Sequence, residues 1–285
     1  SFTKKKYIYN YRSFVVDEFV EIGKLKSNTI TFKFFKYFDK KLIKELSGLV
    51  VLENSALEAL NKSYNLNNIN SEVIRTSTDI SKYLINNKKI NNYLKLVLLG
   101  GARNPYRIDW SLDLIKHLAD FFLKIELTFI NYSDHQYIRS YIDEFQGDDE
   151  KFSFKVIKIE NVNIPKELNK FDAGLIFIEP TPSRFVCSPT KLGEFLSSGL
   201  PVISNKGINV LEYIQNKYKC VYNISVFENK LILKKNEAKF ITNFLKNKNI
   251  RSLCQSVAKK EFNLDLAIEK YDRLYKRILI KNLND

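Results

Sequence analysis

The stretch FDAGLIFIEPTPSRFVCSPTKLGEFLSSGLPVIS, residues 171–204, decides the fold of this chain. It opens with an apolar run at 173–178 that is short and β-rich enough to predict a buried parallel strand. A polar loop with two prolines follows, and a helix is then predicted over 190–198, with Gly199 as its stop. The next strand is expected at 202–204. The stretch is therefore one strand–helix–strand unit of a parallel sheet.

The start of this helix has the features of an anion-binding site. Ser188 is predicted as the N-cap and Pro189 as the first helical residue, where its missing N–H costs nothing. Free amides of the first turn, which begins at Thr190, converge there with the helix dipole, and Lys191 adds a full positive charge. Glu194 lies about one turn further on, where it can accept hydrogen bonds from a sugar hydroxyl. The alternative is a core helix whose Lys and Glu only face water.

The same alternation continues around this unit. Beyond residue 92 the sequence predicts six strands with five crossovers, which is the count for one doubly wound sheet. The strands are expected at 94–99, 125–130, 152–157, 173–178, 202–204 and 220–222. The helices between them are expected at 109–122, 135–145, 165–169, 190–198 and 210–216, and three more close the chain at 236–245, 250–262 and 264–279.

The first part of the chain is also α/β. Strands are predicted at 6–11, 49–52 and 71–74, and helices at 29–47 and 54–64. The helix over 29–47 has apolar residues at steps of one, three and four. This spacing predicts an apolar face that another part of the protein or a partner covers. We expect that cover to be the helix at 264–279, a partner subunit or preceding sequence.

The polar stretch NNKKINN at 86–92 has no periodicity and predicts a linker. We therefore expect a partial α/β domain at 1–88 and a Rossmann-like domain at 89–262. Residues 263–285 are expected to form a C-terminal helix that packs back toward the first domain.

The net charge of +14 comes mostly from dispersed lysines. Nucleic-acid-binding proteins usually show Arg clusters or basic stripes with interleaved aromatics, so no nucleic-acid partner is expected. A weak attraction to phosphates or to an anionic membrane surface is consistent with this charge.

The three cysteines are widely spaced and form neither a disulfide framework nor a zinc pattern, which indicates a reducing compartment. No apolar run reaches the length of about 18 residues that a transmembrane helix needs. We expect a cytoplasmic protein, with at most peripheral contact with the inner face of the membrane.

A second candidate region follows the strand at 94–99. Gly100 and Gly101 permit close approach of the backbone to a ligand. Arg103 and Arg107 can supply charge-assisted, bidentate bonds to a diphosphate. We expect this loop to face the helix start described above, at the carboxyl ends of the strands. The alternative is a solvent-exposed turn with incidental arginines.

The helix segment resembles the nucleotide-sugar-binding segment of the group 1 glycosyltransferases, which have two facing Rossmann-like domains (the GT-B fold). Glu194 and the Gly-Leu-Pro-Val at 199–202 match the second half of that family's pattern. Val186 stands where the family has its first Glu, which usually contacts the donor's sugar. The SPTK at 188–191 is similar to a variant in bacterial surface-polysaccharide transferases.

The resemblance extends to the first part of the chain. Asn10-Tyr11-Arg12-Ser13 and Asp17-Glu18 stand where the family has Asp-x-Arg-Gly and Asp-Glu. It implies that Arg12, Asp17 and Glu18 lie on the acceptor side. It also implies that the first part of the N-terminal domain is missing ahead of Ser1.

The resemblance implies a retaining bacterial glycosyltransferase that moves a hexose-type sugar from a nucleotide-diphosphate sugar to a glycan or lipid-linked acceptor in surface-polysaccharide synthesis. The implied catalytic residues are Arg103, Lys191 and Glu194, and the implied donor-binding residues are Gly100, Gly101, Arg107, Ser188, Pro189 and Thr190. The donor nucleotide is expected to be of the UDP, GDP or TDP type, with no cofactor and no metal. In retaining chemistry the donor phosphate itself can take the acceptor's proton, so the protein mainly supplies positive charge and orientation.

Other functions stay open at this point. A non-catalytic sugar-nucleotide-binding or interaction module would bind the donor without turnover, and a nucleic-acid-binding protein would show tight, salt-sensitive binding. A hydrolase triad is disfavoured, because neither His117 nor His135 has a Ser, Cys or carboxylate at catalytic-looking spacing.

Overall fold

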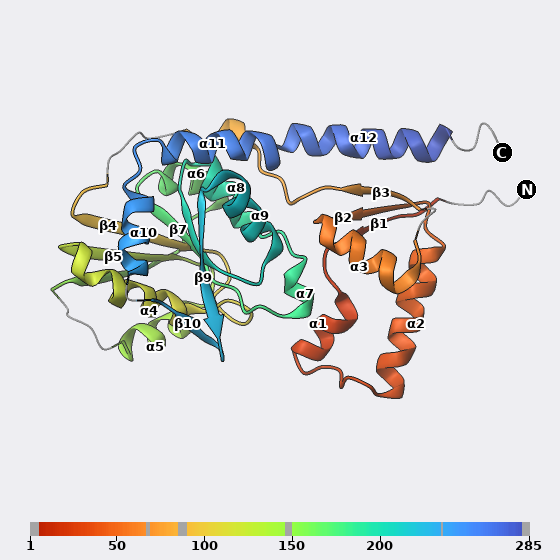
Figure 1. Ribbon diagram of the computed structural model, residues 1–285, viewed down its shortest axis with the longest axis horizontal. Helices are drawn as coiled ribbons and strands as arrows, with labels where there is room; N and C mark the ends of the chain where they lie inside the picture. The colour runs from red at the N-terminus through yellow and green to blue at the C-terminus, as the bar shows by residue number, and fades with distance from the viewer. Residues whose placement is uncertain (1–5, 67–68, 85–89, 146–149, 235, 281–285) are drawn as a thin grey trace, which may run out of the picture. The chain divides into compact units, whose positions relative to one another are not determined.

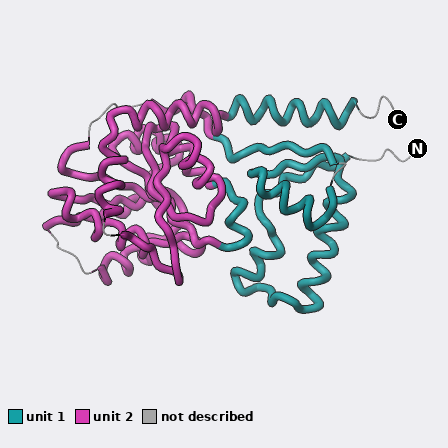
Figure 2. The backbone as a smooth tube through the Cα atoms, in the orientation of Figure 1, with its two compact units in different colours: residues 1–77, 181–188, 264–285 teal, residues 78–180, 189–263 magenta. Residues whose placement is uncertain are grey.

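The computed structural model describes residues 6–66, 69–84, 90–145, 150–234 and 236–280 (Figure 1). The chain divides into two compact units (Figure 2). Unit 1 consists of Ser1–Ser77, Thr181–Ser188 and Leu264–Asp285, and unit 2 of Thr78–Pro180 and Pro189–Asn263. The predicted linker at 86–92 falls partly outside the described residues, and the predicted domains stay a prediction.

Unit 1 is built on a parallel sheet in the order β1-β2-β3, with bounds Ile8–Tyr11, Gly48–Val51 and Asn70–Val73. Helices α1 (Val15–Glu21) and α2 (Ile30–Lys44) join the first two strands, and α3 (Asn54–Tyr64) joins the second to the third. The side chains of β2 alternate between the two faces of the sheet. Leu49 and Val51 pack in one core with Ile43 of α2, and Val50 packs in another with Leu274.

The second of these cores lies under the last helix, α12 (Leu264–Ile280). The ammonium of Lys270 on this helix donates to the carbonyl of Val73 at 2.9 Å, which fixes the helix along β3. The predicted cover of the 29–47 helix by this C-terminal helix is not found. Phe34 and Tyr37 of α2 stay 56 % and 62 % exposed.

The segment Thr181–Ser188 belongs to unit 1 although the chain on either side of it belongs to unit 2. It contains a short helix, α7 (Pro182–Phe185), where the sequence predicted only a loop. Val186 is buried in the core with the β2 side chains. The carboxylate of Glu21 accepts bonds from the Thr181 hydroxyl at 2.8 Å, from the Ser183 amide at 2.8 Å and from the Ser183 hydroxyl.

Unit 2 has a sheet of seven described strands in the order β10-β9-β8-β7-β4-β5-β6. Their bounds are β4 Tyr93–Leu99, β5 Lys124–Ile130, β6 Phe152–Ile157, β7 Ala173–Ile176, β8 Val202–Asn205, β9 Val221–Phe227 and β10 Lys230–Ile232. All are parallel except β10, which pairs with β9 as an antiparallel hairpin. The sequence predicted six strands and missed β10, so that count was wrong by one.

Helices cover this sheet as Figure 1 shows. Their bounds are α4 Ile108–Leu118, α5 His135–Asp143, α6 Ile164–Leu168, α8 Thr190–Ser197, α9 Asn209–Tyr218, α10 Glu237–Leu245 and α11 Ile250–Glu261. Gly174 in β7 lets α8 pack closely, because a Cβ there would overlap the ring of Phe195. The predicted parallel, Rossmann-like α/β fold is confirmed for this unit.

No helix of the described residues has the length and the hydrophobicity that crossing a membrane requires.

Candidate functional site

The order of strands in unit 2 singles out one edge of the sheet. The chain runs from β4 to β5 and β6 on one side, and it then crosses to β7 on the other side of β4. In open parallel sheets such a reversal leaves a crevice outside the carboxyl ends of the two strands, where ligands bind. Here the loop after β4 and residues 177–180 after β7 lie at this edge, both within unit 2.

Lys191 and Gly100 meet at this edge, as the sequence predicted. Gly100 has a φ of +89°, and the ammonium of Lys191 lies 3.9 Å from the position of a Cβ on this glycine. The side chain of Lys191 is buried, and its ammonium lies over the ring of Tyr106 at 3.7 Å from the centroid. Lys191 therefore brings a positive charge to the backbone at the end of β4.

The loop after β4 is held against the end of β7. The amide of Arg107 donates to the carbonyl of Phe177 at 3.2 Å, and the amide of Glu179 donates to the carbonyl of Pro105 at 2.8 Å. These bonds place Tyr106 beside Gly101, where a Cβ would lie 2.5 Å from the ring. A small pocket lies here, lined mainly by apolar side chains together with Lys191 and Asn131.

Replacing Gly101 by Ala tests this packing. The new Cβ forces the Tyr106 ring away from the glycine and takes away the surface on which the Lys191 ammonium rests. We expect nucleoside-diphosphate affinity to fall about tenfold, measured by calorimetry, since small displacements of positioning groups are costly. The double variant Gly101→Ala/Tyr106→Leu relieves the clash and should bind better than Gly101→Ala alone. Equal affinity of the single variant and the wild type would contradict this placement.

Glu194 lies on α8, half-buried, next to Lys191. Burial raises the pKa of the Glu194 carboxyl, while the Lys191 ammonium and a hydrogen bond from the Tyr83 hydroxyl oppose the rise. Burial also raises the pKa of Tyr83, with the nearby Glu194 carboxylate as the next cause. The carboxylate is thus fixed in place by a phenol and a cation of its own unit.

The raised pKa of Glu194 predicts a pH-dependent stability difference. The folded chain holds this proton more tightly than the unfolded chain, so the stabilisation is complete below pH 4.5 and is lost as pH rises through the folded pKa. Glu194→Gln cannot ionise. Relative to wild type, its free energy of unfolding should therefore increase as pH rises above 4.5 in urea titrations. A difference that does not change with pH would show that burial does not govern this carboxyl.

The start of α8 differs from the prediction by one residue. Pro189, not Ser188, is the N-cap, and Thr190 is the first helical residue. The reason lies in unit 1, where the Ser188 hydroxyl and carbonyl are bonded to the Thr76 hydroxyl at 2.9 Å and 2.6 Å. Since Pro189 has no side-chain acceptor, it offers no capping bond to the amides of the first turn.

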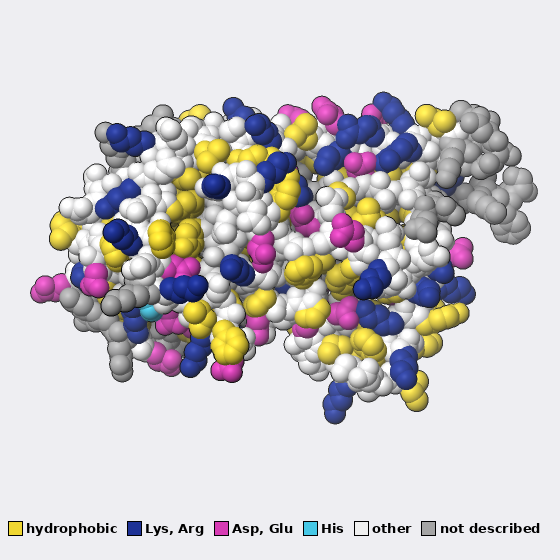
Figure 3. All heavy atoms as spheres, in the orientation of Figure 1, with side chains coloured by type: hydrophobic (Ala, Val, Ile, Leu, Met, Phe, Trp, Pro, Cys, Tyr) yellow, Lys and Arg dark blue, Asp and Glu magenta, His cyan; other side chains and the backbone are white. Residues whose placement is uncertain are grey.

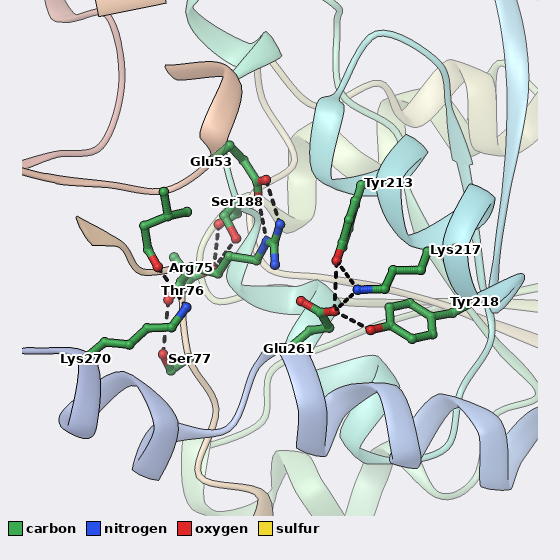
Figure 4. Close-up of polar contacts among 11 residues, drawn as sticks. Glu53, Arg75, Thr76, Ser77, Ser188, Tyr213, Lys217, Tyr218, Glu261 and Lys270 are labelled. Atoms are coloured by element: carbon green, nitrogen blue, oxygen red, sulfur yellow. Dashed lines mark hydrogen bonds and ion pairs between the residues drawn. The ribbon is translucent and has the colours of Figure 1, made fainter. Parts of the chain in front are cut away.

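Ser188 lies beside a buried ion pair of unit 1 (Figure 4). The guanidinium of Arg75 makes bidentate bonds to Glu53, at 2.6 Å and 2.9 Å. Such a pair has fixed geometry, so it holds the backbone at Thr76 that in turn binds Ser188. Sequence reasoning missed both members, because the two residues are far apart in the chain.

The two arginines of the loop after β4 point to partners close by in unit 2. The Arg103 guanidinium bonds the Asp134 carboxylate at 2.8 Å and stacks on the ring of Tyr137. The Arg107 guanidinium pairs with Asp109. Within the described residues, the contacts of the two guanidinium groups do not include Lys191. The predicted roles of both arginines in donor binding stay predictions.

A further charged cluster in unit 2 joins two helices and shares no residue with the site around Lys191. The Glu261 carboxylate at the end of α11 accepts from the Tyr213 hydroxyl at 3.0 Å and from the Tyr218 hydroxyl (Figure 4). Lys217 completes this cluster at 3.3 Å from the carboxylate. It joins α9 to α11 and lies outside the predicted donor residues.

Two residues of the site were missed by sequence reasoning. Tyr83 bonds Glu194, and the Asn131 amide donates to the carbonyl of Gly100 at 2.8 Å. Asn131 follows β5 directly, so its place at the carboxyl edge was a usable signal. Tyr83 gave none, since it lies before the polar stretch at 86–92 and outside every predicted strand and helix.

The predicted acceptor-side residues all lie in unit 1. The Asp17 carboxylate pairs with Lys36 at 2.6 Å, and the Glu18 carboxylate pairs with Arg184 at 2.6 Å. Arg12 is exposed. Their role toward an acceptor stays a prediction, and within the described residues no group of His, Cys, Asp and Glu could hold a metal ion.

Comparisons with known proteins show the fold. No family model matches the chain, and no curated protein matches it in sequence. Sucrose-phosphate synthase from Thermosynechococcus elongatus superimposes with a TM-score of 0.67 at 13% identity, over 97% of this chain and 68% of that one. HepE from Anabaena, solved with UDP, gives 0.68 at 12% identity, over 96% and 73%.

TarM from S. aureus, solved with UDP among other ligands, gives a TM-score of 0.63 at 15% identity. The match covers 96% of this chain and 51% of TarM, so the chain spans only about half of that protein. At these identities the likeness establishes the fold alone. The chain is GT-B-like, with a Rossmann-like fold of parallel strands, as the sequence predicted.

Proposed function

We propose that the chain is a glycosyltransferase that uses a nucleotide-diphosphate sugar as its donor. The observation that carries the proposal is the position of Lys191, whose ammonium lies over Gly100 at the carboxyl edge of the sheet. The likeness to HepE and TarM, both solved with UDP, supports a UDP-type donor, with GDP and TDP as alternatives. We further propose a hexose-type sugar and a glycan or lipid-linked acceptor in bacterial surface-polysaccharide synthesis.

The proposed chemistry follows from charge and orientation. As the sugar leaves, negative charge grows on the diphosphate, and Lys191 with the start of α8 would stabilise it. Arg103 is the proposed second cation, once its guanidinium leaves Asp134 for a phosphate, and Arg107 is a further contact for the diphosphate. In a retaining reaction the donor phosphate can take the acceptor's proton, so the proposal needs no protein base and no metal.

Glu194 is assigned to the donor's hydroxyls. A carboxylate has about four lone pairs, so Glu194 can keep the Tyr83 bond and still accept from a ribose or sugar hydroxyl. Val186, at the family's first Glu position, is buried in the unit 1 core and presents no polar group to the sugar. The hexose is therefore proposed to be held by other groups, which include Pro189 and Thr190 at the start of α8.

The test is turnover of a panel of UDP-, GDP- and TDP-sugars by the full chain, read as nucleoside-diphosphate release with and without glycan or lipid acceptors. Release that depends on Lys191 supports the proposal. Calorimetry with the same nucleotides runs in parallel.

A second candidate is a sugar-nucleotide-binding module without turnover. It is favoured by one observation, that the guanidinium groups of Arg103 and Arg107, the other predicted cations, are each paired with a carboxylate, of Asp134 and Asp109. Binding in calorimetry with no release of nucleotide would select this candidate. Absence of binding to every nucleotide in the panel would rule out both.

A further inference from the structure

The outward side of α2 carries an apolar surface. Six of its large side chains are exposed: Ile30, Phe34, Phe35, Tyr37, Phe38 and Leu42. Their exposed fractions run from 42 % to 88 %, and the rings of Phe34 and Phe38 contact each other with centroids 4.6 Å apart. We call these six side chains the α2 face. Contiguous apolar patches on a protein surface usually mark a binding site.

The α2 face lies opposite the side by which the helix joins its own unit. Ile43 is the buried residue of α2, and Phe32, Lys36 and Asp39 share its side at helical spacing. This inward side already has its partners, since Lys36 bonds Asp17 at 2.6 Å and Asp39 accepts from Tyr64 at 2.9 Å. Among the residues of unit 1 that the structure describes, none therefore covers the α2 face.

The exposed charges of α2 are all positive. Four lysines of the helix are exposed: Lys33, Lys40, Lys41 and Lys44. Across the described part of the chain, none of the four forms an ion pair. Asp39 is the single acid of the helix, and it is turned inward. Figure 3 shows hydrophobic and basic side chains next to each other over this part of unit 1.

A helix with aromatic and aliphatic side chains on one face and lysines beside them has the pattern of helices that lie in a bilayer interface. An uncharged or basic protein partner would leave the lysines without counter-charges, whereas anionic headgroups supply them to a chain of net charge +14. We propose that α2 lies on the surface of a bilayer containing anionic lipids. The α2 face then enters the acyl boundary and the lysines meet the phosphates. The proposal does not depend on the proposed glycosyl transfer.

The experiment is co-sedimentation of the full chain with vesicles of pure phosphatidylcholine or of phosphatidylcholine mixed with phosphatidylglycerol. One variant, Phe34→Ser/Phe38→Ser, removes apolar contact, and a second, Lys33→Gln/Lys40→Gln/Lys44→Gln, removes charge. The matched control is Lys239→Gln/Phe240→Ser on α10, where Phe240 is 60 % exposed. Circular dichroism and thermal melting check that every variant is folded.

The wild type should bind mixed vesicles at least tenfold more tightly than neutral ones, since each lysine near an anionic surface adds about fivefold. The serine variant should lose at least tenfold, because two exposed rings no longer leave water. The glutamine variant should lose about a hundredfold, and with it the preference for anionic lipid. The control should stay within about twofold of wild type.

A second readout places the helix itself. The variant Tyr37→Trp puts an indole on the α2 face, while the native Trp110 is buried and gives a constant background. The emission of this variant should shift to the blue with mixed vesicles and be quenched by brominated lipid. The proposal is overturned by equal binding to both vesicle types, by no binding to either, or by an emission spectrum of the Tyr37→Trp variant that does not shift. It is also overturned if the control loses as much as the α2 variants, or if the wild type does not sediment and forms a dimer that the serine variant abolishes.

Discussion

Glu194→Ala should weaken nucleoside-diphosphate binding by about 2–4 kcal/mol, because truncation leaves the ligand's hydroxyls without acceptors inside a cleft. The same change removes the acceptor of the Tyr83 hydroxyl. Glu194→Gln keeps the shape and part of the bonding, so it should lose less than the alanine variant. Calorimetry with UDP, GDP and TDP measures both.

The control for this prediction is Glu167→Ala, which removes a carboxylate of α6 that pairs with Lys170 and is 20% exposed. It should bind nucleotides as the wild type does. If Glu194→Ala also folds and binds normally, Glu194 has no part in donor binding.

Lys191→Ala should weaken nucleoside-diphosphate binding by about 1.5–3 kcal/mol, the value of a charge-assisted bond to a phosphate. This corresponds to a dissociation constant raised about 10- to 150-fold. Lys191→Arg should recover only part of the loss, since a planar fork replaces a point charge that lies over Gly100 and Tyr106.

Lys217→Ala is the matched control, because Lys217 lies in the same unit with its ammonium 5.0 Å from the ring centroid of Tyr213. It removes the same kind of charge and ring contact away from the crevice. Undiminished affinity of Lys191→Ala for all three nucleotides would end the assignment of this lysine to the diphosphate.

The parallel sheet of unit 2 could be predicted because its central strands are short apolar runs that alternate with helical segments. The strand β10 could not. Its hairpin turns at Glu228 and Asn229, which have φ values of +45° and +60°. Turns of that kind are usually signalled by Asn-Gly or Asp-Gly, and the Glu-Asn found here carries little of that signal.

The meeting of Lys191 with Gly100 could be predicted because topology alone brings strand ends and helix starts to one edge. The directions of Arg103 and Arg107 could not, since each long side chain found a carboxylate nearby, Asp134 and Asp109. Local charge pairs of this kind depend on rotamers that no sequence pattern records.

The start of α8 was misplaced for a related reason. Ser188 has the right chemistry for an N-cap, but its hydroxyl is bonded to Thr76, more than a hundred residues earlier in the chain. The segment Thr181–Ser188 was read as part of one strand–helix–strand unit, and its burial of Val186 beside β2 is a long-range contact. Local helix and strand propensities carry no information about contacts between residues so far apart in the chain.

Unit 1 is assembled from three separate stretches of chain, and this sets an order on its biosynthesis. One face of β2, which carries Val50, stays uncovered until Leu274 and Ile278 have been synthesised. Unit 2 needs nothing after Asn263, so it can complete its fold first. The strands of unit 1 are therefore translated before unit 2 but are covered on this face only after it, and a nascent chain paused before α12 would present an open strand face to chaperones.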